Sequence, residues 1–264
     1  MDYFTTSTFN NTDATGRTNY YGIASVPTAK FDGRRTVGGG TSTTFSNYLS
    51  AYAYEQFYPD TTCLLSIYVD YDSTSRELWV KARVTAVDSF ENARIRYAIA
   101  ENNIAYTWGG SGGGPTIDIN NHVVRKMLPN YNGVSFNINP GESFVDSQTY
   151  TLPLPSGYPL SCCNDKNTEV VVFVQRDDSN KPVLKSVKSG LFPTWVYGDA
   201  TGDSIVNVAD VIYLLNYLFS GGDSPSPLAS VDVNYDCIVN IGDAVYLVNY
   251  VFGGGPEPLK GCAF

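Results

Sequence analysis

The stretch GDATGDSIVNVAD, residues 198–210, returns 33 residues later as VDVNYDCIVNIGD, residues 231–243. The two copies place acidic, amide and branched apolar residues in the same register, and each continues into a similar apolar segment, VIYLLNYLF or AVYLVNYVF. The chain therefore carries a duplicated unit close to its C-terminal end. An acidic loop that recurs in register, each time before an apolar helix pattern, points to a shared ligand.

Within each copy, oxygen-bearing side chains stand at loop positions 1, 3, 5, 9 and 12, counted from the first aspartate. With the backbone carbonyl at position 7, this spacing surrounds one ion with about six or seven hard oxygens, as in a calcium loop of the EF-hand type. We therefore predict two Ca²⁺ sites. Their ligands would be Asp199, Thr201, Asp203, Ile205, Asn207 and Asp210 in the first loop, and Asp232, Asn234, Asp236, Ile238, Asn240 and Asp243 in the second.

The charge of the chain supports a cation in this region. Its net charge is −9, and the segment 199–264 holds seven Asp, one Glu and one Lys, a net −7. Converging carboxylates repel one another without a cation, so we expect metal binding to drive the folding of the loops. Position 6 is Ser204 or Cys237 instead of glycine and position 12 is Asp instead of Glu, which should lower the affinity. The alternative is a pair of Asp/Asn-rich turns without metal.

A helix pattern follows each loop but none precedes it, because FPTWVYG and SPSPLASV both contain proline. The pattern D-x-[TN]-x-D-x-I-V-N-x-x-D followed by Y-L-x-N-Y-x-F-x-G-G resembles the dockerin family from Gly198 to about Pro258. This resemblance implies two Ca²⁺ sites, a nearly two-fold symmetric pair of helices, and docking onto a cohesin-type partner in either of two orientations.

In dockerins, loop positions 10 and 11 help to select the partner, and here all four such residues lack hydroxyl groups. Both exit helices carry apolar residues on more than one face, so one stripe can join the helices while another meets a partner. The expected contact is therefore apolar, and a purely internal core is the alternative. The predicted partner-binding residues are Val208, Ala209, Leu215, Phe219, Ile241, Gly242, Val248 and Phe252.

The rest of the chain reads as β-rich, with 43% hydrophobic, 14% aromatic and only 16% charged residues. Between residues 59 and 195, apolar or alternating runs bounded by Gly, Pro, Asn, Asp or Ser predict eight short strands and a two-layer antiparallel β-sandwich. Residues 45–57 have helical spacing that Pro59 ends. We predict a mainly β protein with α elements, divided into a front segment 1–58, a β-sandwich 59–195 and a dockerin-like domain 196–264.

The front segment contains YYGIASVPTAKFDGRR, residues 20–35, which we interpret as a strand, a Pro-Thr turn and a hairpin. It resembles the part of a thioredoxin fold that holds a cis-proline, which would be Pro27. No cysteine precedes Pro27, so a redox nucleophile is missing; either half of that domain lies elsewhere or another chain supplies it. Residues 20–190 are similar to a family of secreted bacterial, outer-membrane-related proteins, a resemblance that implies a location and a fold but no activity.

Five cysteines fit no zinc spacing. We predict disulfides between Cys237 and Cys262 and between Cys63 and Cys162, with Cys163 as the other possible partner of Cys63. The alternative is five reduced and buried thiols.

Several function classes lack sequence support. No Lys/Arg cluster indicates nucleic-acid binding, and no apolar run approaches the roughly 18 residues of a membrane span. The first residues lack an apolar secretion core, which fits a cytosolic start or, as we prefer, a mature or partial form of a longer precursor. Glu101, Asp118 and Glu142 show no spacing that would make a catalytic set, and the lone His122 is most simply structural. Asn10 begins a glycosylation sequon.

We therefore predict an extracellular, non-catalytic assembly protein whose calcium-stabilised tail attaches to a cohesin-type partner or to further copies of itself. Attachment to further copies would make it a filament subunit. The alternative is a secreted enzyme or carbohydrate-binding protein carried by a dockerin. It would be a thiol oxidoreductase with its C-x-x-C upstream, or a glycan-active sandwich with an aromatic row drawn from Tyr97, Tyr106 and Trp108.

Overall fold

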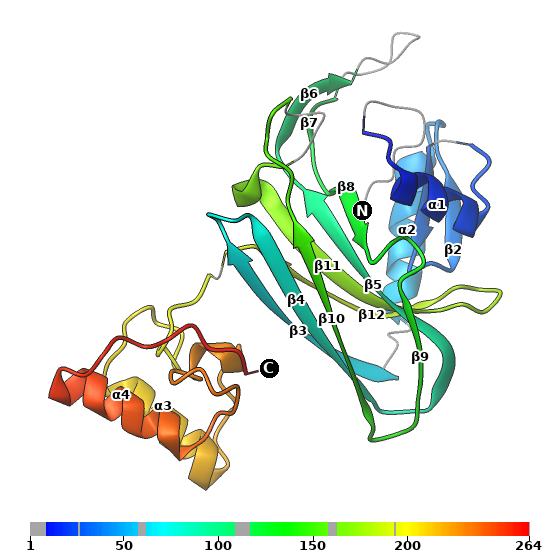
Figure 1. The fold of residues 1–264 in the computed structure, drawn as a ribbon. Coiled ribbons are helices and arrows are strands. Elements are labelled where there is room, and N and C mark those ends of the chain that lie inside the picture. Colours follow the sequence, from blue (N-terminus) through cyan, green and yellow to red (C-terminus); the bar gives the residue numbers. More distant parts are fainter. Residues whose placement is uncertain are drawn as a thin grey trace. The chain divides into compact units, whose positions relative to one another are not determined.

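The computed structural model describes residues 9–25, 27–57, 62–108, 117–157, 163–192 and 194–263 (Figure 1). The chain divides into two compact units, Met1–Leu191 and Phe192–Phe264. The front segment shares the first unit with the sandwich, and the second unit holds the duplicated repeat. Each unit has a hydrophobic core of its own.

The first unit is built on the predicted antiparallel sandwich, which the structure confirms (Figure 1). One sheet has the order β10-β4-β3, and the other has the order β12-β11-β5-β8 with β9 also pairing with β5. The first sheet comprises β3 (Cys63–Asp72), β4 (Glu77–Ala86) and β10 (Ser143–Thr151). The second comprises β5 (Phe90–Glu101), β8 (Val123–Leu128), β9 (Val134–Ile138), β11 (Thr168–Arg176) and β12 (Val183–Gly190).

Alternation along the strands creates the sandwich core. In β4 the residues Leu78, Val80, Ala82 and Val84 are buried, while their neighbours in sequence are less so. The core-facing residues of β5 and β11 meet them from the opposite sheet, in one continuous cluster. Two short pieces complete this unit: the hairpin of β6 (Ile104–Trp108) with β7 (Ile117–Asn120), and the 3₁₀ helix η1 (Asp165–Asn167).

The front segment packs against the sandwich. It contains α1 (Thr12–Tyr21), a hairpin of β1 (Thr28–Phe31) and β2 (Arg35–Gly38), and α2 (Thr44–Phe57), which Figure 1 shows grouped beside one another. The strand expected from Tyr20 is wrong, because α1 extends to Tyr21 and ends at Gly22 with φ of 63°. The Asn11 side chain caps this helix by accepting a hydrogen bond from the Ala14 amide at 2.8 Å.

Buried polar contacts hold α1 on the sandwich. The buried Asp13 carboxylate accepts hydrogen bonds of 3.0 Å from the backbone amides of Met127 and Tyr131 and from Lys126 Nζ. Gly16 allows this approach, since an added Cβ would lie 2.3 Å from the Tyr131 ring. The front segment is therefore an integral part of the first unit.

The second unit contains α3 (Val208–Ser220), the 3₁₀ helix η2 (Leu228–Ser230) and α4 (Ile241–Gly253). The two long helices are the predicted exit helices, and each starts inside its acidic loop. Leu214 and Leu247, one repeat apart, are fully buried in the core between the helices, together with Val231 and Val233. The structure thus confirms a small helical domain at the C-terminal end of the chain.

Candidate metal centre and docking surface

The first loop is organised around Asp199, at position 1. Its Oδ1 atom accepts hydrogen bonds from the Gly202 amide at 2.7 Å and the Asp203 amide at 3.1 Å, and its Oδ2 atom accepts one from the Ser204 amide at 2.7 Å. At position 12, the Asp210 carboxylate accepts hydrogen bonds from the Thr201 amide and hydroxyl, both at 3.0 Å. The loop therefore folds around its own aspartates.

The second loop repeats this arrangement around Asp232. This carboxylate accepts hydrogen bonds from the Asp236 amide at 3.2 Å and the Cys237 amide at 3.2 Å. Asp243, at position 12, accepts hydrogen bonds from the Val233 amide at 3.0 Å and the Asn240 amide at 2.9 Å. Asp232 and Asp243 are both fully buried, so their charges depend on these donors.

Position 6 has the sharp turn that usually calls for glycine. Ser204 has φ of 70° and Cys237 has φ of 63°, so both adopt the left-handed conformation despite having side chains. Tyr235, at position 4 of the second loop, has φ of 63° as well, where the first loop has Gly202. Non-glycine residues are disfavoured in this region, so both loops carry backbone strain.

The end of each loop is also the start of a helix. Asn207 caps α3 and Asn240 caps α4, and each side chain accepts a hydrogen bond from the amide two residues later, at 2.7 and 2.6 Å. Asp210 and Asp243 complete capping boxes by accepting hydrogen bonds from the amides of those asparagines. The sequence analysis missed this second role, which the spacing N-x-x-D before an apolar run could have revealed.

The local surroundings shift two of the aspartate pKa values in opposite directions. Burial tends to raise the pKa of Asp199, but hydrogen bonds from the amides of Ser204, Gly202 and Asp203 outweigh it and hold this pKa below its ordinary value. Burial raises the pKa of Asp243, and the nearby charges of Asp232 and Asp236 contribute in the same direction. Burial and the neighbouring carboxylates thus both disfavour the charged form of Asp243.

The donor chemistry of both loops fits Ca²⁺. The predicted ligands offer only oxygens, from carboxylates, amides, a hydroxyl and backbone carbonyls, which are the donors that a hard cation prefers. In the first loop the Thr201 hydroxyl lies 3.2 Å from Asp199 Oδ1 and 3.0 Å from Asp210 Oδ1, so positions 1, 3 and 12 already converge. Within the described residues, neither loop brings three carboxylates within 4.8 Å of one another.

Exposed apolar residues occur in pairs related by the 33-residue repeat, one pair in the loops and the others on α3 and α4. The exposed fractions match closely: 62% for both Ile205 and Ile238, and 54% and 53% for Ile212 and Val245. We call these pairs the docking face, which also includes the pairs Val208 and Ile241, Leu215 and Val248, and Phe219 and Phe252. Leu215 is half-buried and the other members are exposed. The sequence analysis did not place Ile205, Ile238, Ile212 or Val245 on this face.

The comparisons with known proteins decide the family of this region. Residues 197–252 match the dockerin type I domain. The C-terminal unit contains a dockerin type I domain. This match confirms the resemblance seen in the loop and helix pattern. Dockerin domains generally bind calcium and attach to cohesins. A comparison with curated proteins finds no match to the chain.

Solved structures resemble the chain only distantly. HBP35 of Porphyromonas gingivalis aligns with a TM-score of 0.46 and 15% identity, over 66% of this chain and 55% of that one. A domain of the outer membrane lipoprotein Omp28 from the same organism gives 0.37 and 16%, over 51% and 92%. β-Glucosidase 3B from Thermotoga neapolitana gives 0.25 and 10%, over 50% and 16%. This chain spans about half the length of HBP35, and likenesses this weak carry no information on activity or ligands.

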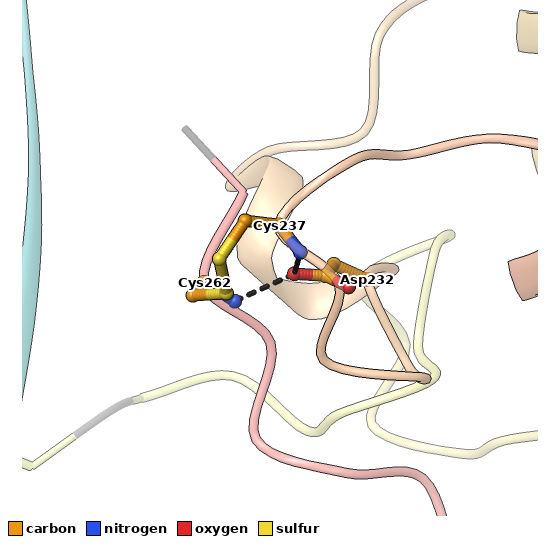
Figure 2. Close-up of side chains that lie close together, drawn as sticks. All are labelled: Asp232, Cys237 and Cys262. Carbon is orange, nitrogen blue, oxygen red and sulfur yellow. Dashed lines mark hydrogen bonds between the residues drawn. A yellow bond between two sulfur atoms is a disulfide. The ribbon is translucent and has the colours of Figure 1, made fainter.

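The dockerin domain contains the predicted bond between Cys237 and Cys262, which the structure confirms (Figure 2). Asp232 lies beside it, and the three residues have ligand atoms within 4.8 Å of one another. In the first unit, Cys163 is disulfide-bonded and Cys63 is a buried thiol. The structure therefore does not support the predicted Cys63–Cys162 bond, and Cys162 itself lies outside the described residues.

Among the residues whose side chains the structure describes, Glu101 and Glu142 have separate partners. Glu101 is fully buried and binds the Arg125 side chain and the Asn164 amide, both at 2.8 Å, whereas Glu142 accepts hydrogen bonds from Asn139 in an exposed turn. The Asp118 side chain lies outside the described part of the structure. His122 is paired with Glu169 at 2.7 Å, and its backbone φ is 56°.

The described members of the expected aromatic row, Tyr97 and Tyr106, have partners within the first unit. Tyr97 is fully buried and donates to Asp146 at 2.9 Å, while Tyr106 packs edge-on against Phe9 at 5.2 Å. The Trp108 side chain lies outside the described residues. Tyr97 is therefore unable to form part of an exposed sugar-binding surface.

Two other sequence predictions have different outcomes. Val26 lies outside the described residues, so the cis state of the Val26–Pro27 bond stays a prediction, as does the thioredoxin-like origin of the front segment. No helix among the described residues has the length and apolar character required to cross a membrane.

Proposed function

We propose that the chain is an extracellular, non-catalytic assembly protein, attached through its dockerin domain to a cohesin-type partner and held in its docking form by two calcium ions. The observation that carries this proposal is the pairing of exposed apolar residues along α3 and α4, one repeat apart, directly after two oxygen-rich loops. Exposed apolar patches of this kind mark protein interaction sites.

The loops are coupled to the helices that carry most of the docking face, because loop and helix share residues. Asp210 and Asp243 serve as loop position 12 and as the third residue of their helices, so loop geometry fixes where each helix begins. Bound Ca²⁺ would stabilise the charged forms of the buried Asp232 and Asp243. The ligand oxygens of each loop would then hold the helix start, and with it Val208 or Ile241, in the position that a partner meets.

The repeat supports docking in either of two orientations. Each member of the docking face has a counterpart 33 residues away in the other repeat, so a rotation that exchanges the repeats presents nearly the same apolar surface. Leu215 and Val248 differ most within the pairs, since only Leu215 is half-buried. A partner groove lined with apolar residues would fit either helix.

The direct experiment is a binding assay of the full chain against immobilised cohesin modules, in calcium and in EGTA. The proposal expects at least one module to bind in calcium and to dissociate in EGTA. The same assay is repeated with the variant Asp203→Ala/Asp236→Ala, which lacks one exposed position-5 ligand in each loop. This variant should bind no module even in calcium. Binding that survives EGTA, or no binding to a broad set of cohesins, would contradict the proposal.

Self-association is a second candidate, favoured by an apolar stripe on α2. Phe45, Leu49, Tyr52 and Phe57 of this helix are 72%, 52%, 55% and 84% exposed, and Phe45, Leu49 and Tyr52 share one helix face. A second copy could cover this stripe and would make the chain a subunit of a larger assembly. Analytical ultracentrifugation in calcium and in EGTA tests this: a monomer under both conditions would exclude it.

A further inference from the structure

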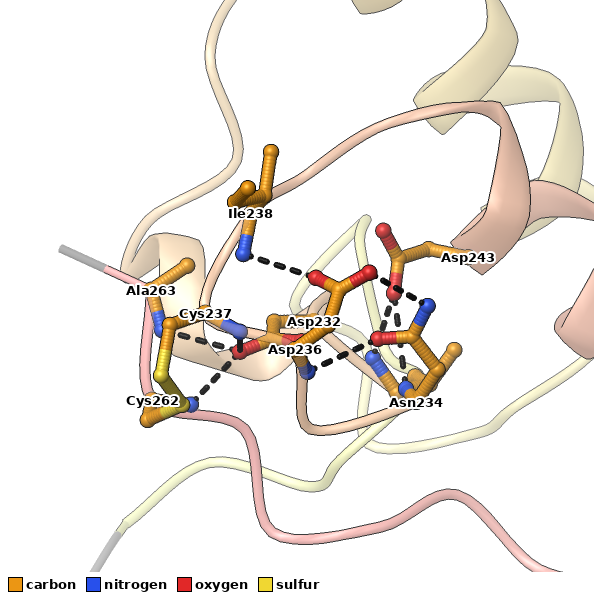
Figure 3. The surroundings of a disulfide bond; sticks show 9 residues. Asp232, Asn234, Asp236, Cys237, Ile238, Asp243, Cys262 and Ala263 are labelled. Atoms are coloured by element: carbon orange, nitrogen blue, oxygen red, sulfur yellow. Dashed lines mark hydrogen bonds between the residues drawn. A yellow bond between two sulfur atoms is a disulfide. The ribbon is translucent and has the colours of Figure 1, made fainter.

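The C-terminal tail, residues 254–263, folds back over the second calcium loop (Figure 3). The Leu259 amide donates to the Val233 carbonyl at 3.0 Å, and the Tyr246 hydroxyl donates to the Glu257 carbonyl at 3.0 Å. Gly261 lies so close that an added Cβ would be 2.2 Å from the Ala229 carbonyl and 2.4 Å from the Asp232 carbonyl. From Glu257 to Gly261 the tail therefore contacts α4, the second loop and η2.

The tail ends on the first ligand of that loop. Asp232 Oδ2 accepts hydrogen bonds from the amides of Cys262 at 2.7 Å and Ala263 at 3.0 Å, in addition to the Cys237 amide at 3.2 Å (Figures 2 and 3). Its other oxygen, Oδ1, accepts the Asp236 amide at 3.2 Å. The tail thus occupies one carboxylate oxygen and leaves Oδ1 on the side of the loop ligands.

The first loop has a different arrangement at the same place. Asp199 Oδ2 accepts the amide of position 6, Ser204, as in the second loop. However, the residues that correspond to Cys262 and Ala263 are Ala229 and Ser230, which belong to η2. The Ser230 amide donates to the Pro227 carbonyl at 3.0 Å instead of to Asp199. The two calcium loops therefore differ in that only the second is joined covalently to the segment whose amides bind its first aspartate.

This covalent link is the Cys237–Cys262 disulfide. Cys237 occupies position 6, where the first loop has Ser204, and its bond to Cys262 joins the turn of the loop to the tail that holds Asp232. We propose that this disulfide is a redox lock on the second calcium loop: its reduction weakens calcium binding there and leaves the first loop unchanged. The inference rests on the proposed function, because it assumes that the loops bind calcium.

The chemical step is a thiol–disulfide exchange with a dithiol reductant. One thiolate of the reductant attacks a sulfur of the Cys237–Cys262 bond and forms a mixed disulfide, and its second thiolate then displaces the remaining protein sulfur. The reductant is oxidised to a disulfide, and Cys237 and Cys262 each gain one electron and one proton. Without the covalent link, only non-covalent contacts, such as the hydrogen bond from the Leu259 amide to the Val233 carbonyl, keep the amides of Cys262 and Ala263 on Asp232.

Loss of these contacts should affect the metal site through Asp232. The carboxylate is fully buried, so a released tail exposes it to water and frees its orientation, and calcium binding must then fix it again. Because the tail keeps its other contacts, only part of the contribution of these two hydrogen bonds is lost, and a loss of about 1.4 kcal/mol corresponds to a tenfold weaker affinity. By reciprocity, calcium should make this disulfide about tenfold harder to reduce.

The first test measures each loop separately in the full chain by calorimetric titration with CaCl₂. Asp203→Ala leaves the second loop to report, and Asp236→Ala leaves the first. Adding Cys237→Ser and Cys262→Ser should weaken calcium binding about tenfold in the Asp203→Ala chain and change it less than about twofold in the Asp236→Ala chain. Cys237→Ser introduces the residue that the first loop already has at this position, so the backbone conformation has a precedent within the chain.

Equal effects on both loops, or no effect on the second, would overturn the lock. If neither single-loop chain bound calcium, the proposed function would fail instead, so the two failures are distinguishable. Gly261→Ala provides a variant with both cysteines intact: the added Cβ displaces the tail and should weaken the second loop in the same direction.

The second test uses the unmodified chain and reads the disulfide directly. The protein is equilibrated with mixtures of reduced and oxidised dithiothreitol, in calcium or in EGTA, and the alkylated peptides are counted by mass spectrometry. The ratio of reduced to oxidised dithiothreitol that half-reduces Cys237–Cys262 should rise about tenfold in calcium. The disulfide that contains Cys163 is the internal control and should not shift. An equal ratio in calcium and EGTA would contradict the proposal.

Discussion

Phe219 and Phe252, one repeat apart on different helices, are 68% and 69% exposed. Two large aromatic side chains in equivalent and exposed places are costly in contact with water unless a partner covers them. Their equivalence also means that either helix can present the same anchor to a partner.

We predict that Phe219→Ala and Phe252→Ala each leave cohesin binding close to that of the parent chain, because the other helix can still dock. The double variant should bind about thirtyfold more weakly, since an aromatic anchor contributes about 2 kcal/mol or more. Surface plasmon resonance measures these affinities. Phe45→Ala, an equally exposed change in the first unit, is the control. Complete loss from one single variant would exclude docking in two orientations.

The buried partners of this face should behave in the opposite way. Leu247→Ala removes a fully buried side chain from the core of the dockerin domain and should lower its free energy of unfolding by about 2–5 kcal/mol. Thermal denaturation followed by circular dichroism should show the helical transition move to lower temperature while the β transition stays in place. Val248→Ala, at the exposed neighbouring position, should have a small effect. If both variants behaved alike, the assignment of the core would be wrong.

The strained turn of the first loop offers a stabilising change. Ser204 has φ of 70°, so Ser204→Gly should relieve steric strain and raise the free energy of unfolding by about 0.5–1 kcal/mol, after allowing for the extra freedom of glycine in the unfolded chain. Urea denaturation of both chains in calcium tests this. Ser224→Gly, at an exposed site without positive φ, should instead destabilise slightly. A loss of stability in Ser204→Gly would show that the turn is unstrained.

The stability of the first unit should depend on pH through Asp177, which joins α1 to the sandwich. Burial tends to raise the pKa of Asp177, but hydrogen bonds from Tyr20, Arg96 and Arg94 outweigh it and hold the pKa below its ordinary value. The stabilisation is therefore complete above the unfolded pKa of about 3.9 and is lost as the pH falls through the lower, folded pKa.

Asp177→Asn should accordingly lower the free energy of unfolding of the first unit at neutral pH, and the gap to the parent should close in acid. Chemical denaturation at a series of pH values measures the gap. Asp88→Asn, an exposed change between β4 and β5, serves as the control. A gap that stayed constant down to the lowest pH would contradict the role of Asp177.

The sequence could predict the sandwich and the dockerin domain because both depend on local patterns. In strand β4 the alternation of ELWVKARVTA indicates which residues face the core, and the two acidic loops can be recognised because the same pattern occurs twice. Helix α1 escaped prediction because its sequence, TDATGRTNYY, has little apolar periodicity. Its position depends instead on Asp13, whose partners Met127 and Tyr131 are more than a hundred residues away.

The candidate site divides in the same way. Ligand spacing within a loop is a local property and could be read directly, as could the Cys237–Cys262 pair from its place near the chain end. The contact of the Cys262 and Ala263 amides with Asp232 could not, because backbone amides have no sequence signal and the contact joins residues about thirty positions apart. The exposure of Ile205 and Ile238 likewise depends on how the helices pack.

The central claim is that two calcium-filled loops hold the docking face of this chain in its binding form. Its most direct test is a calorimetric titration of CaCl₂ into EGTA-stripped full chain, with cohesin binding measured at each stage of saturation. The account predicts two ions bound per chain and cohesin binding that appears only as they fill. The account would be contradicted if CaCl₂ produced no heat of binding, or if the stripped chain bound cohesin as strongly as the calcium-loaded chain.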